Sequence, residues 1–92
     1  MSPELTSEVW SVELSREALK ALRRMPRDQA IRIRRRLGEM EQDPWAAPGI
    51  KKLTDHPGFR LRVGEWRVLF LLREESRSIQ VIRVAKRDEV YR

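Results

Sequence analysis

The sequence contains no cysteine and only one histidine, His56. The absence of cysteine excludes disulfide frameworks, cysteine-based zinc sites and thiol nucleophiles. One histidine is too few for a histidine-based metal site and leaves little from which to build a Ser-His-Asp triad. We therefore expect a protein without a metal or other cofactor.

Long apolar stretches are also missing. The longest uncharged apolar run covers residues 68–72, far short of the roughly 18 residues that span a bilayer. No basic and then apolar signal peptide opens the chain. The sequence therefore predicts a cytoplasmic protein with no membrane partner.

The length of the chain limits it to one small core. Its 92 residues are 40% hydrophobic and 37% charged, and a chain of this size has no room for a second core. We expect residues 1–8 to form a flexible tail and residues 9–92 to form a single domain.

Positive charge is in excess, and arginine carries most of it. Lysine and arginine number 20 against 14 acidic residues, giving a net charge of +6, and only four of the 20 are lysines. The planar guanidinium group matches phosphate with two parallel hydrogen bonds and stacks on bases, which favours a nucleic-acid partner. An acidic protein partner fits the charge equally well, and an ordinary solvated basic surface is a third interpretation.

The first half of the chain predicts a short strand and a helical hairpin. Residues 9–14 are rich in β-forming side chains. Ser15 is a suitable N-cap for a helix that ends near Arg24, and Pro26 suits the first position of a second helix. Apolar residues recur there at helical spacing as far as Asp43 and Pro44, which close the helix.

The second half predicts a loop and then three strands. The expected segments are a loop over residues 44–58, strands over residues 59–63, 66–73 and 79–87, and a short tail over residues 88–92. Gly64 and Glu65 form a two-residue hairpin turn with glycine first, as type II′ prefers. The order β-α-α-β-β-β predicts an α+β fold in which the helical hairpin packs on one face of a mainly antiparallel, four-stranded sheet.

The hairpin turn fixes which side chains share a face of the sheet. Arg62 lies opposite Arg67, and Arg60 lies two residues away on the same face, although like charges directly opposite each other destabilise a sheet. If the last strand pairs so that Ile82 and Val84 point to the apolar face, two further cations join this set, namely Arg83 and Arg87. Five cations on one face without an interleaved acid indicate a site for a polyanion.

Three segments of the sequence carry a family resemblance. Residues 51–53, 57–68 and 83–91 are similar to the RelE side of the RelE/ParE toxin superfamily, and the element order extends the resemblance over residues 9–92. It implies a ribosome-dependent mRNA endonuclease, held inactive by an acidic antitoxin until the antitoxin is degraded. The implied partners are thus the antitoxin, the ribosome and mRNA.

The resemblance also implies a set of site residues. The catalytic positions are Arg60, Arg62, Arg67, Arg87 and Tyr91, and the RNA-binding positions are Lys51, Lys52, Arg83 and Lys86. Cleavage of RNA without a metal begins when the 2′-hydroxyl attacks its own phosphate. Arginines around that phosphate would stabilise the negative charge that develops there.

Two questions stay open at this point. Where the best-known members carry lysines before the hairpin turn, this chain carries Arg60 and Arg62, and arginine is a poor general base. The proton acceptor is then Tyr91, a ribosomal group or a phosphate oxygen. The rival functions are a gyrase-inhibiting toxin of the ParE type and a basic RNA-binding module without catalysis.

The remaining polar and aromatic candidates have simpler interpretations. We expect His56 to be a solvent-facing loop residue, with acid or base catalysis as the alternative. Trp10, Trp45 and Trp66 are expected to be core or loop anchors rather than base-stacking platforms. Residues 34–36, three arginines in a row, are expected to lie on a solvated helix face, with a contact to ribosomal RNA as the alternative.

Overall fold

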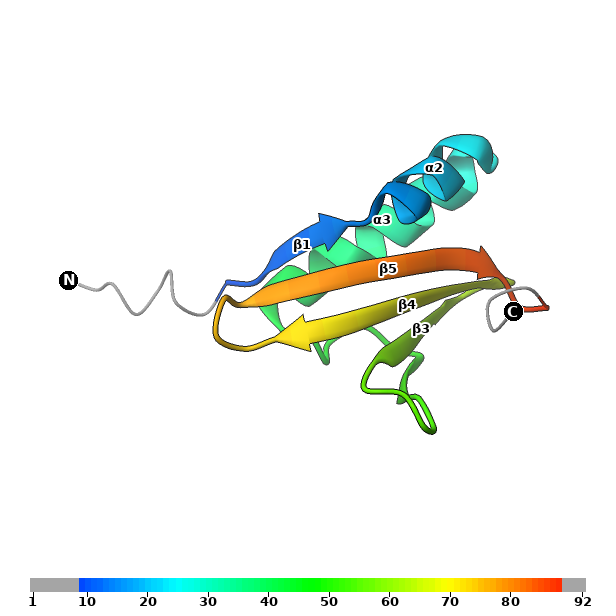
Figure 1. Ribbon diagram of the computed structural model, residues 1–92. Helices are drawn as coiled ribbons and strands as arrows, with labels where there is room; N and C mark the ends of the chain where they lie inside the picture. The colour runs from blue at the N-terminus through cyan, green and yellow to red at the C-terminus, as the bar shows by residue number, and fades with distance from the viewer. Residues whose placement is uncertain (1–8, 89–92) are drawn as a thin grey trace.

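The structure is a computed structural model that describes residues 9–88. Its elements are β1 (Ser11–Leu14), α2 (Arg16–Arg24), α3 (Arg27–Gln42), β2 (Ile50–Lys52), β3 (Phe59–Val63), β4 (Trp66–Arg73) and β5 (Ser78–Lys86). The strands form one sheet in the order β1-β5-β4-β3-β2, and both helices lie on one side of it (Figure 1). The predicted α+β class is therefore confirmed. No helix within residues 9–88 is long and apolar enough to cross a membrane.

Local signals in the sequence set the helix boundaries. Ser15 is the N-cap of α2 as predicted, since its hydroxyl oxygen accepts the N–H of Ala18 at 3.0 Å and also donates to the carbonyl of Ile82 at 2.9 Å. Pro26 is the N-cap of α3 and not its first residue, because its ψ of 140° is extended. Met25 is extended as well, since proline disfavours helical backbone at the residue before it.

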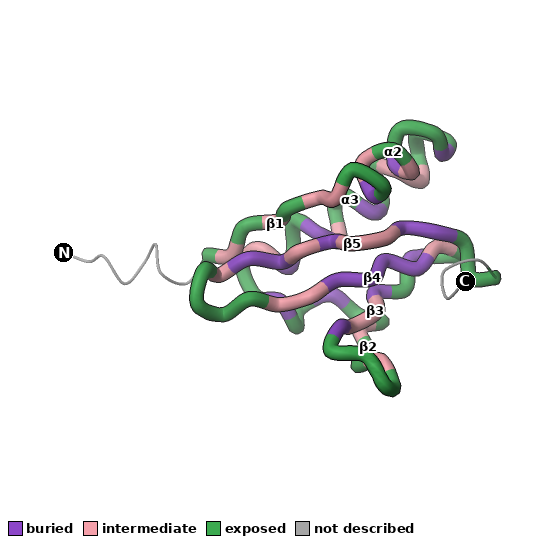
Figure 2. The backbone as a smooth tube through the Cα atoms, in the orientation of Figure 1, coloured by how far each residue is buried: buried purple, intermediate pink, exposed green. Residues whose placement is uncertain are grey.

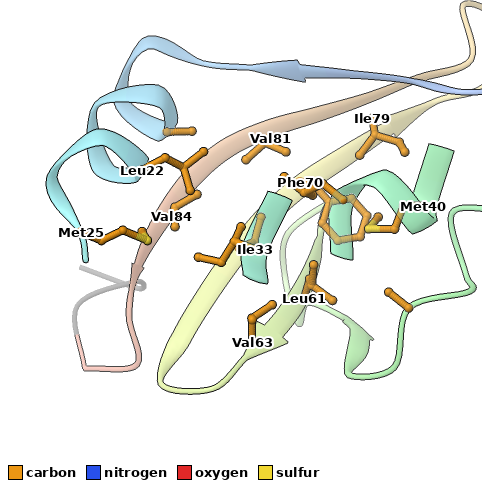
Figure 3. Packing of buried hydrophobic residues seen from close by; sticks show 14 residues of the cluster. Leu22, Met25, Ile33, Met40, Leu61, Val63, Phe70, Ile79, Val81 and Val84 are labelled. Carbon is orange, nitrogen blue, oxygen red and sulfur yellow. The ribbon is translucent and has the colours of Figure 1, made fainter. Parts of the chain in front are cut away.

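The core lies between the helices and the sheet. Figure 3 shows side chains from both helices packed against β3, β4 and β5, with the aromatic ring of Phe70 in the middle. The largest fully buried side chains are Phe70, Ile33, Met40, Leu61, Ile79, Val68 and Val81. In Figure 2 the buried stretches follow the three long strands, and the loops and outer helix faces are exposed. The sheet is thus covered by helices on one face only.

The hairpin register agrees with the prediction at every pair. Val63 lies opposite Trp66, and Arg62 lies opposite Arg67. Gly64 has a φ of +59° and Glu65 does not have a positive φ, which is the sign pattern of a type II′ turn. Leu61, Val63, Val68 and Phe70 therefore face the helices, and Arg60, Arg62 and Arg67 face the other way.

The sheet has five strands, so the predicted count of four was wrong. The additional strand, β2, lies within the expected loop and pairs antiparallel with Phe59–Leu61 of β3. Gly49 allows the turn into this strand because its φ is +88°, and its carbonyl accepts the N–H of Arg62 at 3.1 Å. Three residues are too few to show a recognisable alternation in sequence.

The ends of the first and last strands also differ from the prediction. β1 begins at Ser11, because the N–H of Trp10 bonds to the carbonyl of Glu41 at 2.8 Å rather than to the sheet. β5 covers Ser78–Lys86, one residue earlier at each end than expected. It runs parallel to β1 and antiparallel to β4.

A bulge in β5 moves Ile82 off the expected face. Phe70 pairs with Val81 and Leu69 pairs with Arg83, so Ile82 is an extra residue in the ladder. Its side chain packs against Leu69 and Ala85, away from the main core, whereas Val84 lies in that core as expected. The prediction that Ile82 points to the apolar face was therefore wrong.

We predict that the Gly38→Ala substitution stabilises the protein. Gly38 lies inside α3, is exposed, and a Cβ built on it meets no atom within 4 Å. Alanine is better than glycine in a helix interior by about 1 kcal/mol. Chemical denaturation should show this gain, and the matched Gly64→Ala variant should lose stability because of its positive φ. A less stable Gly38→Ala protein would contradict the prediction.

Candidate functional site

Four of the predicted site residues line one depression on the sheet face opposite the helices. The depression has a volume of about 360 Å³ and is lined by Arg60, Arg62, Arg67 and Arg87; we call it the arginine pocket. The alternation of β3 places Arg60 and Arg62 there, because Leu61 and Val63 point into the core. None of the lining residues within residues 9–88 is acidic.

Arg67 is a fixed part of the pocket floor. Its side chain is only 7% exposed. Its Nη1 donates to the carbonyl of Gly64 at 2.9 Å and to the carbonyl of Trp66 at 3.0 Å. These bonds attach the guanidinium group to the hairpin turn, so its position is set before any ligand arrives. The residue therefore has a structural role that its sequence position did not reveal.

Arg87 reaches the pocket because the end of β5 meets the same turn. Its backbone N–H donates to the carbonyl of Glu65 at 2.9 Å. This bond lies just past the last residue of β5 and brings an exposed arginine from the far end of the chain beside β3 and β4. The Glu65 side chain lines a different hollow, together with Gln29 and Arg32 of α3.

Three of the four pocket arginines have no acidic partner within the described residues. Arg60, Arg62 and Arg87 form no ion pair within residues 9–88. The Nε of Arg60 is buried and has no hydrogen-bond partner, which is uncommon in folded proteins and costs free energy. Arg62 and Arg67 are directly opposite each other, an arrangement that is itself destabilising. The arrangement therefore suits a ligand with several negatively charged oxygens.

The predicted RNA-binding lysines lie on β2 and β5, outside the lining of the arginine pocket. Lys51 lies beside the pocket, directly opposite Arg60 on β2. Lys52 lies over the ring of Phe59, with Nζ 5.1 Å from its centroid, and Lys86 lies 5.9 Å from the ring centroid of Trp66. Both of those rings pack against the main core.

Among the described residues, Arg83 is the one predicted member of the cation face that does not line the arginine pocket. Arg83 lines a separate groove between α2 and β5, with Lys20, Arg24 and Lys86. Arg83 lies opposite Leu69, which lies opposite Arg60, so its register position is on the expected face although it does not line the arginine pocket. Tyr91 lies outside the residues that the structure describes.

His56 has a structural contact in its loop. Its Nδ1 accepts the N–H of Gly58 at 2.9 Å. Gly58 is itself tightly enclosed, since a Cβ there would lie 2.8 Å from the carbonyl oxygen of Phe70. The ring is exposed, as expected of a loop histidine, and it does not line the arginine pocket. Within residues 9–88, no three His, Asp or Glu side chains gather around a possible metal position.

The other candidates divide between the core and the surface. Trp66 is an anchor, since its Nε1 donates to Oε1 of Gln29 at 2.6 Å, and Trp10 packs against the core. Trp45 contacts Phe59 but is 57% exposed. In the arginine run, Arg36 donates to the carbonyl of Pro48 at 3.4 Å and holds the following loop, while its two neighbours are exposed.

We predict that the Arg62→Glu substitution makes the protein more stable. It replaces a like-charge pair across the ladder with an opposite-charge pair facing Arg67. Such a change is worth about 0.2–1 kcal/mol at low salt, and less at high salt because the site is exposed. Urea denaturation at two salt concentrations measures both effects. A loss of stability at low salt would show that the pair does not repel.

We predict the opposite for the Arg67→Ala substitution. It removes the donor for two carbonyls at a residue that is only 7% exposed, and lost hydrogen bonds of this kind cost about 1–3 kcal/mol. Thermal unfolding should show a clear loss, whereas Arg62→Ala should be nearly neutral. Equal stabilities for the two alanine variants would contradict the structural role of Arg67.

The comparisons with known proteins agree with this fold. A family model described as the ParE toxin of the type II toxin-antitoxin system parDE matches residues 12–91. Among curated proteins no relative matches. The chain is thus recognised through a family pattern and through its structure.

Several solved structures have a similar fold. An archaeal RelE–RelB complex from Pyrococcus horikoshii contains a chain with a TM-score of 0.77 at 20% identity, covering 89% of this chain and 99% of that one. A chain of the toxin-antitoxin complex RelBE2 from Mycobacterium tuberculosis has a TM-score of 0.74 at 21% identity, with coverages of 86% and 99%.

The isolated E. coli RelE toxin is similar as well. Its TM-score is 0.72 at 21% identity, and the match covers 89% of this chain and 90% of that one. At these identities the structures show a common fold, and the family model covers most of the sequence. The chain therefore belongs to the RelE/ParE superfamily of type II toxins.

Proposed function

We propose that this toxin is an endoribonuclease that cuts mRNA on the ribosome and so inhibits translation. The observation that carries the proposal is the arginine pocket, whose lining in the described part of the chain consists of Arg60, Arg62, Arg67 and Arg87 and includes no acid. A phosphodiester that gains negative charge during cleavage is the kind of ligand that such a pocket stabilises.

The chemistry follows from the charge of the transition state. The 2′ oxygen attacks the adjacent phosphorus, the bond to the 5′ oxygen breaks, and the products are a cyclic phosphate and a free 5′-hydroxyl. Arg67 is held by the turn and needs no rearrangement to face this charge. Arg62 and Arg87 are exposed and can close on the phosphate. The ribosome supplies the alignment of the substrate, which a domain of this size does not provide alone.

The proton of the 2′-hydroxyl needs an acceptor. The arginines of the pocket are poor bases, because a guanidinium group keeps its proton in a folded protein. We retain Tyr91, a ribosomal group and a phosphate oxygen as the candidates. The leaving 5′ oxygen must also gain a proton, and a ribosomal group or water can supply it.

A gyrase-inhibiting toxin of the ParE type is the second candidate, because the matching family model bears the ParE name. Such a toxin acts by binding a protein and has no need to cut RNA. The two candidates share a fold, so the distinction rests on what the arginine pocket binds. A third candidate, a basic module that binds RNA without cutting it, would retain RNA affinity but produce no cleaved ends.

We further propose that an acidic antitoxin covers the groove between α2 and β5. Similar toxins are known in complexes with RelB proteins. β1 pairs with β5 only between Ser78 and Val81, so residues 82–86 run beside α2 with no strand of residues 9–88 on that side. An extended acidic segment can add to such an edge. Lys20, Arg24 and Lys86 line this groove, and Glu17 is the one acid among its described lining residues.

The test of the proposed function is induction of the toxin in cells, with mapping of mRNA 5′ ends. We expect cuts inside reading frames that disappear when ribosomes are inactive. The Arg62→Glu variant should lose them, with cleavage of a message on purified ribosomes falling about 100-fold or more, as on removal of one charge-stabilising donor. Because this variant is expected to be more stable, a folding defect would not explain the loss.

The matched control is Arg23→Glu, which makes the same charge change at an exposed site on α2. It should retain full cleavage. DNA damage signalling with intact messages would instead support the gyrase-inhibiting candidate. Unimpaired cleavage by Arg62→Glu would remove the arginine pocket from the mechanism.

A further inference from the structure

Trp45 is an exposed aromatic side chain near the edge strand β2. It is 57% exposed, more than Val9 or Ile31, the other large apolar side chains that reach the surface of residues 9–88. It lies in the loop between α3 and β2, at the end of the sheet order where β2 is the edge strand. More than half of its surface is open to solvent among the described residues.

The loop holds this ring in a fixed position. The N–H of Trp45 donates to Oδ1 of Asp43 at 3.0 Å, and the N–H of Ala46 donates to the carbonyl of Asp43 at 2.9 Å. The neighbouring Pro44 and Ala47 are buried and anchor the loop on both sides. A tight, hydrogen-bonded turn therefore holds Trp45 at the surface.

A row of aromatic rings connects Trp45 to the core. Its ring meets that of Phe59 edge to face, at 5.1 Å between centroids and 78° between planes. Phe59 in turn stacks on the fully buried Phe70 at 5.6 Å. A ring supported in this way loses little conformational entropy when a flat partner covers its free side.

The edge strand β2 joins this aromatic row to the arginine pocket. Lys51 lies opposite Arg60, which lines the pocket, and Lys52 lies opposite Phe59, which supports Trp45. Consecutive strand residues point to opposite faces, so the two lysines put positive charge on both sides of one edge. Neighbouring strands are about 4.8 Å apart, so the path from the pocket to this edge is short.

We propose that Trp45 stacks on an unpaired RNA base. An RNA strand whose phosphate occupies the arginine pocket crosses the edge at β2, with its backbone against Lys51 and Lys52, and places a base on the exposed ring. Unpaired bases stack on aromatic side chains regardless of sequence, and lysines beside them hold the backbone. The base comes from the message or from ribosomal RNA. This inference rests on the proposed RNA-cutting function.

The test compares Trp45→Phe with Trp45→Leu. Phenylalanine retains a flat ring, whereas leucine retains apolar bulk without one. For a single-stranded RNA of about a dozen nucleotides, we expect the leucine variant to bind about 5- to 150-fold more weakly and the phenylalanine variant to stay within about threefold. Quenching of tryptophan fluorescence by RNA should be lost in both. Ile31→Ala, at an exposed apolar site on α3, should change neither measurement.

The same variants on purified ribosomes carrying a message identify the source of the base. A defect with the isolated RNA assigns the base to the message. A defect only on ribosomes, seen as a higher toxin concentration for half-maximal cleavage with an unchanged maximal rate, assigns it to ribosomal RNA. Thermal unfolding of each variant identifies a temperature at which all variants are folded. RNA binding and cleavage are compared at that temperature.

Three results would overturn the inference. One is equal RNA binding and ribosome activity for the leucine variant and the unchanged protein. Another is a leucine variant as good as the phenylalanine variant, which would indicate an ordinary apolar contact. The third is a defect confined to antitoxin binding. If Arg62→Glu also leaves RNA binding unchanged, the proposed function fails. If Arg62→Glu weakens RNA binding, while Trp45→Leu changes neither RNA binding nor activity on ribosomes, only the stacking contact fails.

Discussion

The two-residue turn at Gly64 and Glu65 is the constraint on which the candidate site depends. It fixes the hairpin register and therefore sets Arg62 against Arg67. Its carbonyl at Gly64 binds the guanidinium group of Arg67, and its carbonyl at Glu65 binds the backbone of Arg87. One short turn thus orders arginines from three strands or strand ends. A residue inserted here would shift the register by one, turn the side chains of β4 to the opposite face, and so separate Arg67 from Arg62.

The cost of this arrangement falls on the folded protein. A like-charge pair across the ladder and a buried guanidinium nitrogen without a partner both oppose folding. The helices and the apolar face of the sheet offset this cost with a core in which Phe70, Ile33 and Met40 are fully buried. The face of the sheet that contacts the helices therefore stabilises the protein, and the arginine face destabilises it. Such a division is common at functional sites.

Much of the fold could be predicted because its signals are local. The N-cap at Ser15, the apolar spacing of the helices and the glycine-first turn each act within a few residues, so the hairpin register and the arginine face could be worked out in advance. The bulge at Ile82, the short strand β2 and the separation of Arg83 from the pocket depend on contacts between distant segments. Likewise, nothing in the residues around Trp45 distinguishes an exposed ring from a buried one. That difference arises from the position of its loop at the edge of the sheet.

The same edge has a consequence for the solution behaviour of the free toxin. An unpaired outer strand is a template onto which another copy of a protein can add, and such pairing leads to aggregation. Here β2 is only three residues long and ends in two lysines. An approaching copy could therefore form only a few backbone hydrogen bonds, and its own lysines would be repelled by the like charge. The toxin released from its antitoxin is protected at this side from self-association, by the same cations that would attract a polyanion.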